Sequence, residues 1–134
     1  MHRRPTSLVV ALLAVLGSAC GLAQTDPDWV TLRNPLPACG VEEGVELDLG
    51  ARTCILEAHE AGDTGELISR MTSIEGDPIV RYTRVHANGV VEIFHDATRD
   101  RFGSGRWERL VCERLVPDPQ LVFVEEDCRD LPIP

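Results

Sequence analysis

The sequence predicts an α+β domain in which one N-terminal helix packs on a four- to five-stranded antiparallel meander sheet, stapled by disulfides. Three observations indicate this fold class. Apolar residues recur every three or four positions over residues 49–61. From residue 66 onward the pattern changes to short β-prone segments separated by Gly, Pro, Asn and Asp. Four cysteines between residues 39 and 128 add the expectation of disulfide bonds.

The helix is predicted over residues 49–61. Asp48 can act as its N-cap by accepting a hydrogen bond from the first turn, and Gly62 can end it in the left-handed conformation. Ala51 and Ile55 lie four residues apart and therefore share one face of the helix. We expect this face to pack on the sheet.

Five strands are predicted after the helix, each antiparallel to the one before it. Their β-branched and aromatic residues favour strands, and turn-forming residues lie between them. The predicted strands cover residues 66–74, 79–86, 90–95, 106–115 and 120–125.

The Ala87-Asn88-Gly89 loop admits two registers for the hairpin around it. A two-residue turn would place Val85 opposite Glu92 and Thr83 opposite Phe94. A three-residue loop is favoured, because it sets opposite charges, aromatic residues and β-branched residues across from one another. Its pairs are Arg84 with Glu92, Tyr82 with Phe94, Thr83 with Ile93 and Val85 with Val91, so the aliphatic members share one face and the aromatic members the other.

The N-terminus has the layout of a secretory signal peptide over residues 1–19. Two arginines precede an apolar run at residues 8–16, which is too short to span a bilayer. The following Gly17-Ser18-Ala19-Cys20 resembles the lipobox of bacterial lipoproteins. This resemblance implies cleavage just before Cys20 and diacylation of its thiol with fatty acids. An ordinary signal-peptidase cut after Ala23 would instead give a free secreted protein.

Lipidation of Cys20 would anchor the chain to the outer face of the cell membrane, in the bacterial cell envelope. Residues 20–37 then form a short lipid-anchored tether, in which Trp29, Val30 and Leu32 can dock on the folded part. Residues 38–134 are predicted to form a single α+β domain.

The exported part of the chain is strongly acidic. Arg3 and Arg4 are the only two of the 13 basic residues in the signal peptide, which leaves 11 arginines against 22 acidic residues and a net charge of −11. Such a charge repels nucleic acid and anionic headgroups. We therefore expect no nucleic-acid partner, and attachment to the membrane through the lipid.

Once Cys20 is lipidated, an even set of four cysteines remains for two disulfides. The chain has no C-x-x-C motif and no Cys/His spacing of the zinc type. Three pairings are open, and the favoured one closes the two shortest loops. It joins Cys39 with Cys54 and Cys112 with Cys128.

Residues 71–115 carry a second resemblance. Glu-Gly-Asp-Pro-Ile at 75–79 is followed by Asp-Ala-Thr-Arg-Asp-Arg-Phe-Gly at 96–103 and by a strand that ends in Cys112. This order is similar to that of a small uncharacterised domain found in bacterial lipoproteins and secreted proteins. The resemblance implies a compact α+β fold. That family has no assigned activity, so it implies no catalytic residue and no cofactor.

The turn at 75–78 and the loop at 96–105 lie at the same end of a meander sheet, and their charged residues form a predicted interaction rim. Three interpretations are open: turn formation, a surface for a protein partner, and a Ca²⁺ site built from carboxylate oxygens. The spacing matches no EF-hand loop and the arginines can neutralise the acids, so no metal ligand is predicted. The rim consists of Glu75, Asp77, Asp96, Arg99, Asp100 and Arg101.

The sequence thus predicts a noncatalytic, envelope-anchored lipoprotein that serves as a binding or interaction module for an envelope protein. One alternative is a small metal-assisted hydrolase or enzyme accessory that uses the rim carboxylates. Another is a secreted inhibitor. His95 and Asp96 do not suggest a catalytic dyad, because neighbouring strand residues point to opposite faces. No cofactor is predicted, and the oligomeric state is left open.

Overall fold

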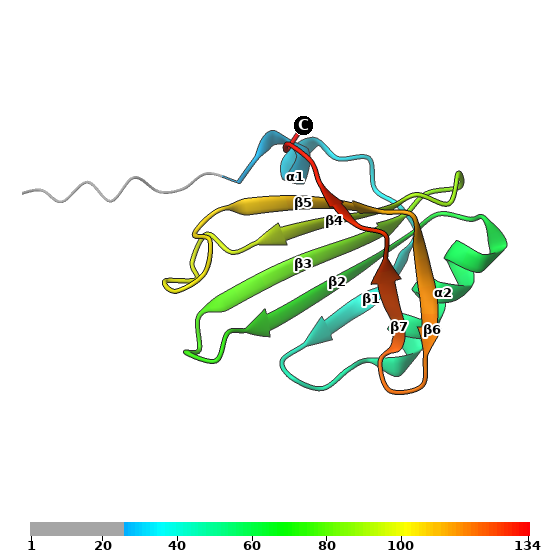
Figure 1. The fold of residues 1–134 in the computed structure, drawn as a ribbon, viewed down its shortest axis with the longest axis horizontal. Coiled ribbons are helices and arrows are strands. Elements are labelled where there is room, and N and C mark those ends of the chain that lie inside the picture. The colour runs from blue at the N-terminus through cyan, green and yellow to red at the C-terminus, as the bar shows by residue number, and fades with distance from the viewer. Residues whose placement is uncertain (1–25) are drawn as a thin grey trace, which may run out of the picture.

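The computed structural model describes residues 26–134, which form a mostly β structure with two short helices (Figure 1). Six strands make one mixed sheet in the order β1-β2-β3-β4-β5-β8, and β6 and β7 form a separate two-stranded sheet. The predicted fold, one N-terminal helix on an antiparallel meander, is therefore wrong. The elements are α1 (Asp28–Leu32), β1 (Ala38–Glu43), α2 (Leu49–Ala61), β2 (Gly65–Thr72), β3 (Pro78–Val85), β4 (Val91–Asp96), β5 (Trp107–Cys112), β6 (Arg114–Asp118), β7 (Val122–Glu126) and β8 (Arg129–Asp130).

Two features separate the observed sheet from the predicted meander. β1 pairs with β2 in parallel, with Ala38 opposite Glu66, and α2 is the crossover that parallel neighbours require. The segment predicted as one strand at 106–115 is broken after Cys112, so β6 leaves the large sheet and pairs with β7. The β1 sequence contains Gly and no clear alternation of apolar and polar residues, so its local pattern gives no strand signal.

The predicted helix over 49–61 is confirmed as α2. The Asp48 side chain accepts a hydrogen bond from the Ala51 amide at 2.9 Å, and Gly62 ends the helix with a left-handed φ of 69°. Ala51 and Ile55 are buried against the sheet. A Cβ at Gly40 would lie 2.8 Å from the Ala51 Cβ, so the glycine is what lets β1 approach α2 this closely.

The predicted register of the β3–β4 hairpin is confirmed. Arg84 lies opposite Glu92 and Tyr82 opposite Phe94, as the three-residue loop requires. From β2 through β5 the strands are antiparallel neighbours, so this part of the sheet follows the predicted succession. Val85 on this hairpin is completely buried beneath α2.

The hydrophobic core lies between one face of the six-stranded sheet and a layer formed by α2 and the β6–β7 hairpin. The opposite face, which we call the outer face, is crossed by α1 and by the C-terminal segment (Figure 1). The buried core residues are Ala51, Ile55, Leu56, Leu67, Val85, Val91, Ile93, Cys112, Leu115 and Phe123.

Both favoured disulfides are confirmed. Cys39–Cys54 joins β1 to α2, and Cys112–Cys128 joins the end of β5 to the segment before β8. Disulfides of this kind persist in oxidising compartments. The domain is therefore extracytoplasmic.

The signal peptide at 1–19 and the lipidation site at Cys20 lie outside the described residues. From residue 26 onward the predicted tether is partly docked: Trp29 is buried on the outer face, whereas Leu32 is 78 % exposed. Within residues 26–134, none of the helices has the length and apolar character needed to cross a membrane.

Candidate functional site

Two glutamates and three arginines form an ionic network on the outer face. Glu66, Arg84 and Glu92 lie opposite one another on β2, β3 and β4, so their side chains point to the same side. Glu66 pairs with Arg33 and with Arg84, each at 3.0 Å. Glu92 pairs with Arg109 at 2.7 Å and lies 3.8 Å from the Arg84 guanidinium. The network therefore spans four strands and the residue that follows α1.

The centre of this network is buried. Glu66 and Arg84 are each only 7 % exposed. Arg84 also donates from Nη2 to the carbonyl of Asn34 at 2.7 Å, which holds the chain after α1 against the sheet. Its Nε lies 3.0 Å from Glu66, but the N–H is not directed at the carboxylate and has no hydrogen-bond partner. The hydrogen bond to Glu66 raises the pKa of Arg33.

An aromatic cluster adjoins the network on the same face. Trp29 stacks on Phe94 with ring centroids 3.6 Å apart, and meets Tyr82 and Trp107 edge-on at 5.3 Å and 5.4 Å. Burial raises the pKa of the Tyr82 hydroxyl. The Nε1 of Trp29 is buried without a hydrogen-bond partner. Trp29 is thus the residue through which the aromatic cluster holds α1 on the sheet.

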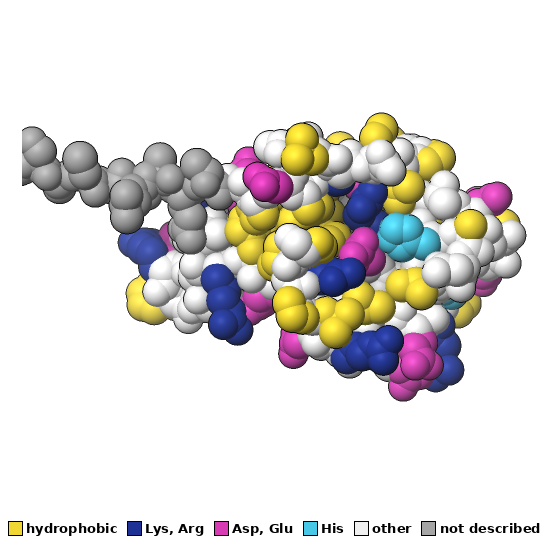
Figure 2. Space-filling model, turned by 90° about the horizontal axis from the view of Figure 1, so that it is seen from above, with side chains coloured by type: hydrophobic (Ala, Val, Ile, Leu, Met, Phe, Trp, Pro, Cys, Tyr) yellow, Lys and Arg dark blue, Asp and Glu magenta, His cyan; other side chains and the backbone are white. Residues whose placement is uncertain are grey.

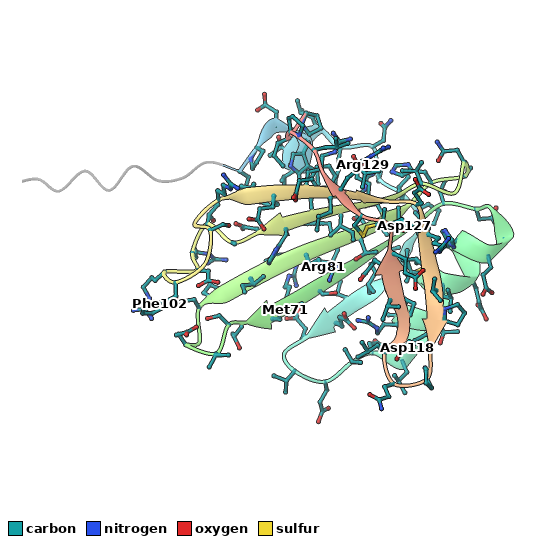
Figure 3. The ribbon with its side chains drawn as sticks, viewed as in Figure 1. Met71, Arg81, Phe102, Asp118, Asp127 and Arg129 are labelled. Atoms are coloured by element: carbon teal, nitrogen blue, oxygen red, sulfur yellow. A yellow bond between two sulfur atoms is a disulfide. The ribbon has the colours of Figure 1, made fainter. Side chains whose placement is uncertain are left out.

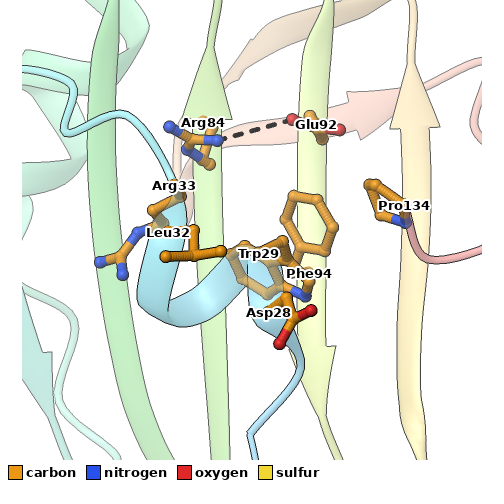
Figure 4. Close-up of a pocket in the computed structure, with 8 residues that line it drawn as sticks. All are labelled: Asp28, Trp29, Leu32, Arg33, Arg84, Glu92, Phe94 and Pro134. Atoms are coloured by element: carbon orange, nitrogen blue, oxygen red, sulfur yellow. Dashed lines mark ion pairs between the residues drawn. The ribbon is translucent and has the colours of Figure 1, made fainter.

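A cavity of about 370 Å³ opens between α1, the network and the C-terminal segment (Figure 4). Its apolar walls are next to the charged Arg84–Glu92 pair, and Glu92 also lines a neighbouring hollow of about 570 Å³ beside His86. From the α1 side, the surface shows hydrophobic side chains around basic and acidic ones, with a histidine alongside (Figure 2). The lining residues are Asp28, Trp29, Leu32, Arg33, Arg84, Glu92, Phe94 and Pro134.

The predicted rim lies at the end of the sheet where β2 turns into β3 and β4 continues into β5. The structure brings Asp77 and Arg101 together across these two loops: Asp77 accepts from the Arg101 side chain at 3.0 Å and from its backbone amide at 3.1 Å. These hydrogen bonds lower the pKa of Asp77 and raise that of Arg101. Phe102, next along the chain, projects from the tip of the β4–β5 loop (Figure 3).

The other rim carboxylates bond within their own turns. Asp96 accepts from Thr98, and Asp100 accepts from the amides of Phe102 and Gly103 at 3.1 Å and 3.0 Å. Glu75 accepts from the nearby Ser73 hydroxyl, and Arg99 is exposed. Within residues 26–134, no three or more His, Cys, Asp or Glu side chains are grouped so that they could hold a metal ion. The rim is thus not one convergent site, and its carboxylates shape the loops.

Sequence reasoning missed the outer-face cavity. The predicted β3–β4 register placed Arg84 opposite Glu92, but the sequence gave no reason to expect that Arg84 would be buried. Glu66 and Arg33 join them only because β2 and the segment after α1 are brought to the same face. The available signal was the apolar group Trp29, Val30 and Leu32, which was expected to dock on the folded part.

Comparisons with known proteins give no relative. No family model matches the chain, and neither a curated protein nor a solved structure matches it. We therefore base its function on the geometry of the outer face and of the loops at the end of the sheet.

Proposed function

We propose that the protein is a noncatalytic, lipid-anchored binding module of the bacterial cell envelope. Diacylated Cys20 would hold it at the outer face of the cell membrane, and the outer-face cavity would bind an envelope partner. The signal-peptide layout and lipobox resemblance support the anchor. The two disulfides support an exported chain.

The observation that carries the binding role is the cavity itself. Trp29 and Phe94 give it an apolar wall, and Leu32 stands 78 % exposed at its side. The adjoining network contains three arginines and two glutamates, so it carries an excess of positive charge. This is a local exception in a chain whose net charge is −9. An apolar side chain with a neighbouring carboxylate, as on a segment of an envelope protein, fits these surroundings best.

A binding role fits the carboxylates better than hydrolysis does. Glu66 and Glu92 are each held by arginines, and Asp77 accepts from Arg101 of the neighbouring loop. Asp96 and Asp100 accept hydrogen bonds inside their own loop. Both carboxylate oxygens of Glu66, Glu92 and Asp77 lie against basic groups, which leaves these three glutamate and aspartate side chains poorly placed to activate water or to coordinate a metal ion.

Site-specific photocrosslinking in intact cells tests the binding site. A benzophenone amino acid at Leu32 should give a discrete crosslinked product, because this side chain lies at the cavity and is exposed. Val45, which is 89 % exposed between β1 and α2, is the matched control and should give none. Absence of a product at Leu32, or the same product from both positions, would contradict the proposed site.

Intact-mass analysis of the natively expressed protein tests the anchor. The expected chain begins at Cys20 and carries a diacylglyceryl group, with the other four cysteines oxidised. An unmodified chain that begins near Gln24 would instead identify a free secreted protein, for which the inhibitor role becomes the leading function.

A further inference from the structure

We propose that the end of the sheet formed by the β2–β3 turn and the β4–β5 loop faces the lipid bilayer and inserts Ile74 and Phe102 into its interface. This inference rests on the proposed lipid anchor at Cys20. It adds an orientation and a second contact with the membrane, made by the folded domain itself.

The two apolar side chains are exposed at the tips of neighbouring loops. Ile74 is 102 % exposed and Phe102 is 74 % exposed, so neither contributes to the core. The ion pair between Asp77 and Arg101 joins the loops at 3.0 Å, three residues after Ile74 and immediately before Phe102. Asp100 further shapes the second loop by accepting from the Phe102 amide. The ion pair therefore ties together the two loops that carry the exposed Ile74 and Phe102.

The described chain approaches the middle of the sheet, where Trp29 stacks on Phe94, from the side on which these loops lie (Figure 1). Trp29 in α1 packs against Trp107, the residue with which β5 starts after the loop. Farther along, Arg33 and Asn34 contact Glu66 and Arg84, which lie toward the opposite end of β2 and β3. The chain thus runs away from the two loops, and in Figure 1 its described start lies on the side where both loops lie.

The distance to the anchor is short. Cys20 precedes Asp26 by six residues, and an extended chain spans at most about 3.6 Å per residue, so the lipid can be at most about 22 Å from Asp26. The opposite turn at 87–89 lies one strand length from the two loops, about 27 Å for the eight residues of β3. A lipid on Cys20 therefore keeps the domain close to the bilayer, and the direction of the described chain before α1 favours the end formed by the two loops.

Three exposed arginines flank Phe102 in the β4–β5 loop: Arg99, Arg101 and Arg106. Arg101 pairs with Asp77 and Arg106 lies 4.0 Å from Glu108, so Arg99 carries the charge that headgroups can reach most directly. Exposed arginines beside an aromatic residue are typical of segments that lie in the membrane interface. Among the described residues 26–134, no other loop carries three exposed arginines.

Depth-dependent quenching tests the orientation on the mature, acylated protein in vesicles of phosphatidylethanolamine and phosphatidylglycerol. Ser104→Cys places a single thiol on the β4–β5 loop, and Asn88→Cys places one at the opposite turn as the matched control. Both positions are exposed, and the native cysteines are occupied by the lipid or by disulfides. Each thiol carries an environment-sensitive fluorophore, and spin-labelled lipid is the quencher.

The label at position 104 should be quenched at least about threefold more strongly than the label at 88. Ile74→Ser combined with Phe102→Ser should abolish that difference, whereas Val45→Ser, which removes another exposed apolar residue, should leave it unchanged. Circular dichroism verifies that the variants are folded.

Equal quenching at 104 and 88, or no effect of the double serine variant, would overturn the proposed orientation while leaving the anchor intact. A chain without the diacylglyceryl mass on Cys20 would overturn the anchor, and the inference with it. The mass and the quenching ratio therefore distinguish the two failures.

Discussion

Trp29→Ala is the sharpest test of whether the segment before β1 belongs to the folded unit. This side chain is 8 % exposed and carries the contacts of α1 with the rings of Phe94, Tyr82 and Trp107. α1 has only five residues, too few to be stable without tertiary packing. Removing the indole should therefore release the helix as well as leave a gap in the aromatic cluster.

The expected cost follows from the burial of the ring. A buried tryptophan removes about 150 to 250 Å² from water, which at about 25 cal/mol per Å² corresponds to about 4 to 6 kcal/mol. This is an upper bound, because the unfolded chain already buries part of that area. Truncation of buried Trp to Ala typically costs about 3 to 5 kcal/mol. We expect this loss of unfolding free energy, and a Tm lower by at least about 12 °C.

Urea unfolding of the oxidised protein measures the loss, with Trp107 fluorescence and circular dichroism as probes. Leu32→Ala, in the same helix but 78 % exposed, is the control and should change the free energy of unfolding by less than about 0.5 kcal/mol. A cost below about 1 kcal/mol for Trp29→Ala would refute the reasoning, because it would mean that α1 is not part of the cooperative unit.

Three further predictions concern the ionic contacts and the disulfides. Glu66→Gln removes the charge shared by two arginines, so the free energy of unfolding in urea should fall by about 3 to 5 kcal/mol; an unchanged midpoint would show that the network is not stabilising. Hydrogen bonds from Arg101 lower the pKa of Asp77 in the folded protein. The ionised carboxylate therefore stabilises the fold at pH values above the pKa of Asp in the unfolded chain, about 3.9. This stabilisation is lost as the pH falls through the lower pKa that Asp77 has in the folded protein. Asp77→Asn should flatten the acid side of a Tm-against-pH profile, and parallel profiles for the two proteins would count against the ion pair. Cys112→Ser combined with Cys128→Ser removes the disulfide that closes a loop with a sequence separation of 16. The free energy of unfolding measured in urea should fall by about 3 kcal/mol. A double variant with the wild-type urea midpoint would show that this disulfide does not stabilise the fold.

Features that depend on neighbouring residues could be predicted from the sequence. The helix over 49–61 has its cap at Asp48 and its stop at Gly62, so its ends are encoded within a few positions. The β3–β4 register depends on a three-residue loop and on the pairs that it creates, as with Arg84 and Glu92. The disulfides follow the shortest loops, which the folded chain allows because α2 returns beside β1.

The candidate site could not be predicted in the same way. The rim was expected from the adjacency of two loops, and this adjacency is real for Asp77 and Arg101. Its other carboxylates turned out to bond within their own turns, since an Asp in a tight loop finds backbone amides close at hand. The cavity depends on Trp29, whose packing partners are more than 50 residues away in the chain.

By itself, the sequence determined the local elements of this protein: one capped helix, the antiparallel succession from β2 to β5, the hairpin register and the two disulfides. Only the tertiary structure decided that β1 adds in parallel at the edge, that β6 and β7 leave the sheet, and that α1 covers the outer face. The physical reason is the range of the interactions. Caps, turns and cross-strand pairs act between residues close in the chain, whereas the burial of Trp29 and the shared charge of Glu66 exist only after distant segments have packed together.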